Sequence, residues 1–172
     1  DCGCFTPDGR LFFAGQGDIW EGAIVPDDDP NSRIATLVGA RIAPVALLNT
    51  DNANAGSMAV DGLAPAGKWL YAGVRGRHMG CILRVPIPAK TLYGEGSGDF
   101  PEPKVHLKAM SHALEKTEVI VPDTGGLTSF CACEAEGQPR VFYRGESDEK
   151  GIGLWLWTGA GEPKRIANEP RD

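Results

Sequence analysis

Two features are missing from this 172-residue sequence, and their absence excludes several classes of partner. No apolar run approaches the roughly 20 consecutive residues that a membrane-spanning helix needs. Basic residues are too few to form a stripe, because 17 Lys and Arg stand against 23 Asp and Glu and the net charge is −6. An acidic chain of this kind is a poor binder of nucleic acid or of an anionic membrane surface, so we expect neither as a partner.

Three chemical signatures are missing as well. The sequence contains no phosphate-binding glycine loop and no Asn-x-Ser/Thr glycosylation acceptor. The segment GEGSG at 94–98 is not the nucleophile elbow G-x-S-x-G, because Glu95 stands where the first glycine of that motif belongs. The sequence therefore indicates neither phosphate-loop chemistry nor a serine nucleophile of the elbow type.

Turn-forming residues, in contrast, are abundant, and a pattern recurs between them. The 23 glycines and 13 prolines favour many short strands over long helices. Three times, a basic residue precedes three apolar or aromatic residues, a variable residue and a glycine: RLFFAG at 10–15, KWLYAG at 68–73 and RVFYRG at 140–145. Each copy belongs to a group of four strand candidates. In chain order these are 2–5, 10–15, 18–25 and 31–38, then 56–63, 68–73, 81–87 and 102–109, then 127–134, 140–145, 153–159 and 162–169.

This fourfold grouping predicts the fold class. Four-stranded antiparallel units repeated around an axis are the blades of a β-propeller. We therefore predict an all-β fold with three blades, at about 1–40, 54–112 and 125–172. The glycines that close the pattern lie 58 and 72 residues apart, so insertions must separate some strands. A generic β-sandwich or barrel is the alternative, because short strands alone do not distinguish these architectures.

The segment DCGCFTPDGRLFFAG at 1–15 resembles the hairpin phrase x-G-L-A-F-S-P-D-G-R-x-L-Y-x-A. That phrase is typical of six-bladed propellers of the SMP-30/gluconolactonase, strictosidine-synthase-like and major-royal-jelly (yellow) group. The segment 60–73 is similar to it, and 131–145 is less so because it lacks Pro-Asp-Gly. The resemblance implies that this chain supplies three blades of a six-bladed ring, and it supports architecture more than activity.

Three blades cannot close such a ring, since a terminal blade would leave an apolar face exposed. We therefore expect a second chain to complete the propeller. Two kinds of partner stay open: another fragment of the same protein, which a start at Asp1 without methionine favours, or a second copy that joins as a homodimer. In the homodimer, the first blade of one copy lies beside the third blade of the other.

The resemblance also implies a site at one mouth of the central channel, with a divalent ion, calcium above all, held by oxygen ligands. Asp1 and Asp61 take the position before the G-L-A phrase, where members of the group commonly bind the metal. Asp61 is expected as a metal ligand, and Asp1 as a residue near the bound ligand. The other expected metal ligands lie in connections between blades, where the alternative is an ordinary turn. They are Asp51, Asn52 and Asn54 in the segment 49–56, and Asp123 in the segment 122–126.

The turn at 75–78 supplies the expected proton-transfer group and anion contacts. His78 is the candidate general base, and Arg75 and Arg77 are candidate ligand-binding residues. The alternative for His78 is a solvated loop histidine.

Five cysteines allow three interpretations. Cys2 and Cys4 form one C-x-C pair, Cys131 and Cys133 form another, and Cys81 stands alone. Residues i and i+2 of a strand share a face, so each pair presents two sulfurs on one side. The thiols are buried small apolar groups, or partners in disulfides, or part of a metal site. Disulfides would place the protein in an oxidising compartment, secreted or extracytoplasmic.

Two functions follow from these observations. The first is a small-molecule enzyme of the lactonase or strictosidine-synthase-like type, which uses a divalent ion in the channel to polarise a carbonyl or ester. The alternative is a non-catalytic propeller that binds a small ligand or a protein partner as one subunit of a closed ring. The incomplete set of metal ligands favours the alternative.

Overall fold

The computed structural model describes most strands of the chain and some of their connections. Within the described residues the fold is all-β, with three four-stranded antiparallel sheets and no helix, and therefore no helix that is long and apolar enough to cross a membrane. This confirms the predicted fold class at the level of strands and sheets. The described residues are 2–15, 18–26, 35–43, 59–75, 80–90, 117–127, 129–147 and 151–168.

The first sheet contains β1 (Gly3–Phe5), β2 (Leu11–Gly15), β3 (Asp18–Pro26) and β4 (Ala35–Ala43), paired in chain order. All four overlap the strands predicted for the first copy of the repeat. The last strand extends to Ala43, a little beyond the predicted boundary near residue 40.

The second sheet contains β5 (Ala59–Ala66), β6 (Trp69–Arg75), β7 (Gly80–Pro86) and β8 (Glu118–Val121). Its first three strands overlap the predicted ones.

The fourth strand of this sheet differs from the prediction. The prediction placed it at 102–109, which lies outside the described residues, and ended the blade near 112. The strand that pairs with β7 is β8, with Leu83 opposite Val119 and Arg84 opposite Glu118. Three β-branched residues in succession, 119–121, explain why this segment forms the edge strand.

The third sheet contains β9 (Ser129–Ala135), β10 (Gln138–Ser147), β11 (Gly151–Trp157) and β12 (Lys164–Asn168). All four strands overlap the predicted ones. The two-residue turn between β9 and β10 holds Glu136 and Gly137 at φ angles of 56° and 72°. Such angles match the primed turns that connect hairpin strands.

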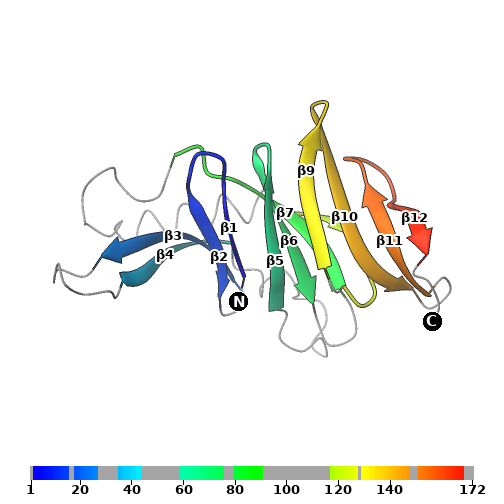
Figure 1. Ribbon diagram of the computed structural model, residues 1–172, viewed down its shortest axis with the longest axis horizontal. Helices are drawn as coiled ribbons and strands as arrows, with labels where there is room; N and C mark the ends of the chain where they lie inside the picture. Colours follow the sequence, from blue (N-terminus) through cyan, green and yellow to red (C-terminus); the bar gives the residue numbers. More distant parts are fainter. Residues whose placement is uncertain are drawn as a thin grey trace.

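The three sheets lie side by side in chain order, with β5 between β1 and β9 (Figure 1). The first strand of the second sheet contacts the first strand of both neighbouring sheets. Each sheet is open, and the described strands do not form a closed ring. The second sheet is therefore covered on both faces, whereas the first and third sheets are each covered by a described sheet on one face only.

Two apolar cores fill the two junctions between sheets. The first core joins the first and second sheets and is built around Phe12, Ile19, Leu70, Val74 and Val85, all of which are fully buried. The second core joins the second and third sheets. Its buried members are Ala66, Tyr71, Ile82, Val121, Leu127, Val141, Tyr143 and Trp157.

Equivalent positions of the sequence repeat face opposite ways in the first and second sheets, so the buried faces of these two sheets are offset by one residue. Phe12 of β2 packs toward the second sheet, and the aligned position of β6 is Leu70. Toward the third sheet, however, β6 presents Tyr71. A shift by one residue exchanges the two faces of a strand.

Candidate functional site

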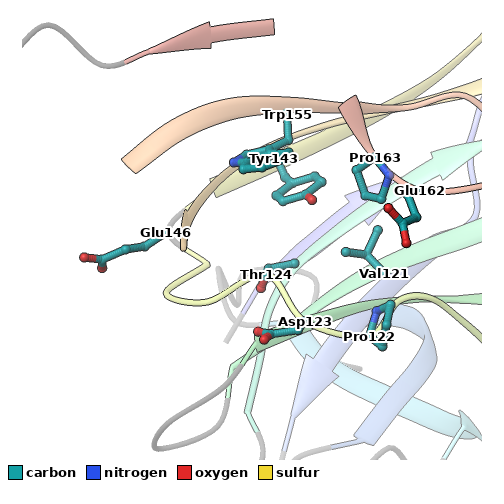
Figure 2. Close-up of a pocket in the computed structure, with 9 residues that line it drawn as sticks. All are labelled: Val121, Pro122, Asp123, Thr124, Tyr143, Glu146, Trp155, Glu162 and Pro163. Atoms are coloured by element: carbon teal, nitrogen blue, oxygen red, sulfur yellow. The ribbon is translucent and has the colours of Figure 1, made fainter. Parts of the chain in front are cut away.

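A pocket of about 270 Å³ lies between the second and third sheets (Figure 2). It is bordered by the end of β8, the connection that follows it, strands β10 and β11, and the turn before β12. Its lining residues are Val121, Pro122, Asp123, Thr124, Tyr143, Glu146, Trp155, Glu162 and Pro163.

Backbone hydrogen bonds hold the connection after β8 in place beside the pocket. The N–H of Thr124 donates to the carbonyl of Gly80 at 2.8 Å, and the carbonyl of Thr124 accepts from the N–H of Glu146 at 3.1 Å. The Asp123 carboxylate accepts from the N–H of Gly125 at 2.8 Å, which closes a local turn. Gly125 has a φ of 61°, and a Cβ there would lie 1.6 Å from the carbonyl oxygen of Glu146. This connection is therefore fixed between β7 and β10.

Stacked aromatic rings form one wall of the pocket. Tyr143 and Trp155 are cross-strand partners in β10 and β11, and their rings stack with centroids 6.3 Å apart and planes at 9°. Burial raises the pKa of Tyr143 to about 12, and the nearby Asp123 carboxylate adds to the rise. The hydroxyl of Tyr143 therefore stays protonated at neutral pH.

The pocket is acidic. Asp123 and Glu162 contribute carboxylates from two separate segments, and the lining contains no Lys, Arg or His. Figure 2 shows that the side chain of Glu146 points away from the other lining groups. Carboxylates beside an aromatic face suit a ligand that carries a positive charge, because the charge is attracted both to the anions and to the ring faces.

A second pocket, of about 550 Å³, lies between the same two sheets near the β5–β6 and β9–β10 hairpin ends. Two basic side chains line it, and both lie against the Trp69 ring, with Lys68 Nζ 5.8 Å and the Arg84 guanidinium 4.3 Å from its centroid. Arg84 also donates from Nε to Glu118 at 2.9 Å. Arg84 is also the cross-strand partner of the buried Tyr71. Since these contacts already occupy Arg84, we place the candidate ligand site in the acidic pocket.

The structure brings two of the predicted site residues together. Asp61 of β5 forms an ion pair with Arg75 of β6, in which Arg75 Nε lies 2.6 Å from Asp61 Oδ2. Both side chains are at least partly exposed. The cation that faces Asp61 in the described structure is thus a guanidinium.

The remaining predicted site residues fall into two groups. Asp123 lines the acidic pocket, where the resemblance had placed a metal ligand. The others lie outside the described residues, namely Asp1, Asp51, Asn52, Asn54, Arg77 and His78.

The described residues do not fit a divalent ion. Within the parts of the chain that the structure describes, no three His, Cys, Asp or Glu side chains are grouped so that they could hold a metal. Asp61 is paired with Arg75, and Asp123 accepts from Gly125. The calcium site therefore stays a prediction from the resemblance.

The cysteines form no disulfide within the chain. The two C-x-C pairs belong to β1 and β9, and the second sheet lies between these strands (Figure 1). The pairs are therefore held apart, which excludes the disulfide interpretation for a bond between them inside one chain.

The thiols differ in their surroundings. Cys2, Cys4 and Cys81 pack against the first core, and burial raises the pKa of both Cys4 and Cys81 to about 11. These three fit the interpretation as small apolar groups. Cys131 and Cys133 are exposed on the third sheet and do not fit it.

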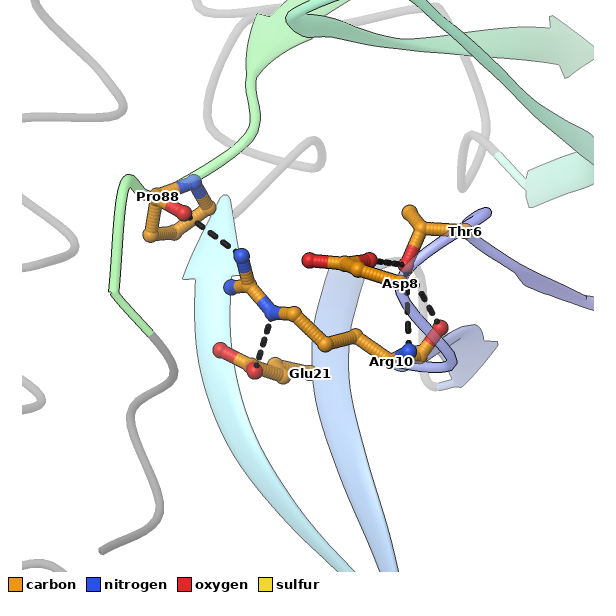
Figure 3. Close-up of polar contacts among 5 residues, drawn as sticks. All are labelled: Thr6, Asp8, Arg10, Glu21 and Pro88. Carbon is orange, nitrogen blue, oxygen red and sulfur yellow. Dashed lines mark hydrogen bonds and ion pairs between the residues drawn. The ribbon is translucent and has the colours of Figure 1, made fainter. Parts of the chain in front are cut away.

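The turn between β1 and β2 carries a buried polar network that the repeat pattern did not reveal (Figure 3). Arg10 donates from Nε to Glu21 at 2.9 Å and from Nη1 to the carbonyl of Pro88 at 2.6 Å. Thr6 bonds to Asp8 and to the backbone of Arg10. The basic residue of the first repeat copy thus connects the first sheet to the segment after β7, which is a structural role.

Sequence reasoning did not identify the other lining residues of the acidic pocket. Tyr143 and Trp155 lie in neighbouring predicted strands. Pairing these two strands as a hairpin would have placed the two rings opposite each other. Glu162 comes from a turn whose position depends on the pairing of β11 with β12. No signal in the sequence placed that turn beside Asp123.

No protein-family model matches the chain, and no curated protein and no solved structure matches it either. The class that the structure defines is an all-β protein of three consecutive four-stranded antiparallel sheets.

Proposed function

We propose that this chain is a three-blade part of a β-propeller and that it binds a small cationic molecule without transforming it. The architecture is supported by three consecutive four-stranded sheets whose first strands are neighbours. Innermost strands that adjoin one another are what blades around a common axis require.

The acidic pocket carries the functional part of the proposal. Its lining combines the carboxylates of Asp123 and Glu162, a stacked Tyr–Trp pair and no basic side chain. A quaternary or primary ammonium group gains from both features, since ring faces attract cations and carboxylates pair with them. The pocket volume of about 270 Å³ suits a small molecule rather than a peptide.

Binding is favoured over catalysis because the described members of the expected metal set are engaged elsewhere. Asp61 pairs with Arg75, and Asp123 closes the turn at Gly125. The metal-dependent reaction with His78 as proton-transfer group stays a prediction from the resemblance, and it is a separate function that a metal analysis of the purified protein would test.

The experiment is a titration of the chain with choline, followed by the fluorescence of Trp155 and by calorimetry. We expect saturable binding that Glu162→Gln and Asp123→Asn each weaken about tenfold, or about 1.4 kcal/mol, because each change removes a negative charge that attracts the trimethylammonium group. Asn keeps the acceptor oxygen that closes the turn at Gly125, so Asp123→Asn removes charge with little change in shape.

Two controls make the test specific. Glu134→Gln removes a carboxylate that does not line the acidic pocket and should leave the affinity unchanged. The neutral analogue of choline, in which carbon replaces nitrogen, should not bind. Equal affinity for choline and this analogue would contradict the proposal, as would the absence of saturable binding.

A further inference from the structure

The third sheet presents an apolar face that no described sheet covers. This outer face lies opposite the second core, on the side of β10 that carries Phe142 rather than Tyr143. Ile152 and Leu154 are 37% and 39% exposed there. The outer face of the third sheet consists of Ser129, Cys131, Cys133, Arg140, Phe142, Arg144, Glu146, Ile152, Leu154 and Leu156. Contiguous exposed apolar side chains of this extent indicate an interaction surface.

This face repeats a face that is buried elsewhere in the same chain. In the first sheet, Cys4 of a C-x-C pair lies opposite Phe12, and the second sheet covers both. In the third sheet, Cys131 of the other C-x-C pair lies opposite Phe142. The third sheet therefore carries the same side chains that the first sheet uses to pack against the sheet that follows it.

The first sheet presents the complementary surface. Phe13 and Trp20 are cross-strand partners whose rings stack with centroids 6.3 Å apart and planes at 12°. The matching pair of the third sheet, Tyr143 and Trp155, stacks with the same separation and belongs to the second core. The outer face of the first sheet consists of Phe5, Leu11, Phe13 and Trp20 with the glycines between them.

Two glycines keep this surface flat. A Cβ atom at Gly22 or Gly39 would lie 2.9 or 2.7 Å from the Phe13 ring, so the ring lies directly on both residues. Phe5 extends the surface at the end of β1 and is 63% exposed. A flat aromatic face of this kind suits packing against another sheet.

The two outer faces also carry the two groups of a cation–π contact. At the junction of the second and third sheets, the guanidinium of Arg84 lies 5.8 Å from the centroid of the Trp157 ring on the sheet opposite. The outer face of the third sheet carries Arg140 and Arg144, and the outer face of the first sheet carries Trp20. The same contact between a guanidinium and an indole ring is thus available between them.

We infer that the occupant of the third sheet's outer face is a second copy of this chain, which docks through the outer face of its first sheet. Two such junctions related by a twofold axis join six sheets into one closed ring. The inference rests on the propeller arrangement proposed above and names the partner that completes it. Cys131 and Cys133 then lie within each junction.

The test is the mass of the chain in solution, measured by sedimentation over a range of concentrations. We expect a species of twice the 18.3 kDa chain mass. Leu154→Glu on the third sheet and Phe5→Glu on the first sheet should each give monomers. Val119→Glu is the matched control, because Val119 is 52% exposed on β8 and lies on neither outer face. It should leave the dimer intact.

Mixing the two monomeric variants identifies the faces that meet. Leu154→Glu keeps an intact first sheet and Phe5→Glu keeps an intact third sheet, so the mixture should recover a dimer through one unaltered junction. A monomeric wild-type chain, an effect of only one of the two variants, or a mass that grows beyond two chains would overturn the inference.

The variants also separate this inference from the proposed ligand function. The acidic pocket lies on the covered face of the third sheet, so the folded Leu154→Glu monomer should still bind choline. Circular dichroism of each variant confirms that the strands have formed. A dimer that does not bind choline would support the inferred docking and contradict the ligand proposal. A monomeric wild-type chain that binds choline would support the ligand proposal and contradict the inferred docking.

Discussion

Arg10 and Glu21 form an ion pair that is almost fully buried, with side-chain exposures of 14% and 1% and an Nε–Oε1 distance of 2.9 Å. The guanidinium also donates to the carbonyl of Pro88, so one side chain connects two neighbouring sheets. The pair sits at the edge of the junction filled by the first core. Removal of one partner of a buried pair leaves an uncompensated charge, which costs more than the pair contributes.

We therefore expect Arg10→Met to lower the free energy of unfolding by about 3 to 5 kcal/mol, because the buried Glu21 carboxylate loses the Arg10 guanidinium. Urea denaturation followed by tryptophan fluorescence measures this change. The double variant Arg10→Met with Glu21→Met should recover most of the loss, since two apolar side chains of similar length replace the pair. If the double variant is no more stable than Arg10→Met, the charge of Glu21 is not the cause.

The hairpin turn between β9 and β10 offers a stabilising change. Glu136 has a φ of 56°, a left-handed conformation that costs a residue with a Cβ roughly 1 kcal/mol. Asn tolerates this conformation and forms, with the following Gly137, the preferred dipeptide of a type I′ turn. We expect Glu136→Asn to raise the free energy of unfolding by about 0.5 to 1 kcal/mol.

Thermal unfolding measures this gain. Glu136→Gln is the matched control, because it also loses the exposed 3.4 Å contact with Arg140 but keeps the unfavourable backbone conformation. Equal stability of the Asn and Gln variants would show that the turn conformation carries no cost.

Ionisation of Tyr143 links stability to alkaline pH. Its pKa is about 12 in the folded chain and near 10 when exposed, because burial and the Asp123 carboxylate disfavour the phenolate. A group with a raised folded pKa contributes fully below its unfolded pKa, and that contribution is lost as the pH rises through the folded value. We expect the free energy of unfolding to fall between about pH 10 and 12, and to fall less in Tyr143→Phe.

Denaturation at a series of pH values tests this expectation. The difference between wild type and Tyr143→Phe should be constant from pH 7 to 9, as an internal control, and should change only above pH 10. Parallel curves across the whole range would contradict the assigned pKa.

The strands were predictable because they depend on local signals. The recurring pattern of apolar stretches between Gly, Pro and Asp turns predicted segments that overlap eleven of the twelve described strands. The exception, β8, is informative. The Glu-Pro-Lys sequence at 102–104 repeats that at 162–164, where it precedes a real strand. Edge-strand identity, however, depends on which distant segment pairs with β7, and a local repeat does not determine that pairing.

The candidate site was predictable only in part for a related reason. Asp123 was identified because it lies in a connection between two repeat units, which is where the resemblance placed a site. Trp155 lies within a predicted strand, and in the structure it stacks on Tyr143. Its role as a pocket wall arises only because the second and third sheets face each other there.

The amino-acid sequence alone determined the all-β class, the threefold repeat and the positions of the hairpin turns, because strand periodicity and turn chemistry act over a few neighbouring residues. Only the tertiary structure decided which face of each strand is buried. In the second sheet, residues at equivalent positions of the repeat face the opposite way from those of the first sheet, and such a shift by one residue exchanges buried and exposed faces. The tertiary structure also decided which carboxylates meet and which apolar faces stay open to a partner, because both depend on packing between sheets.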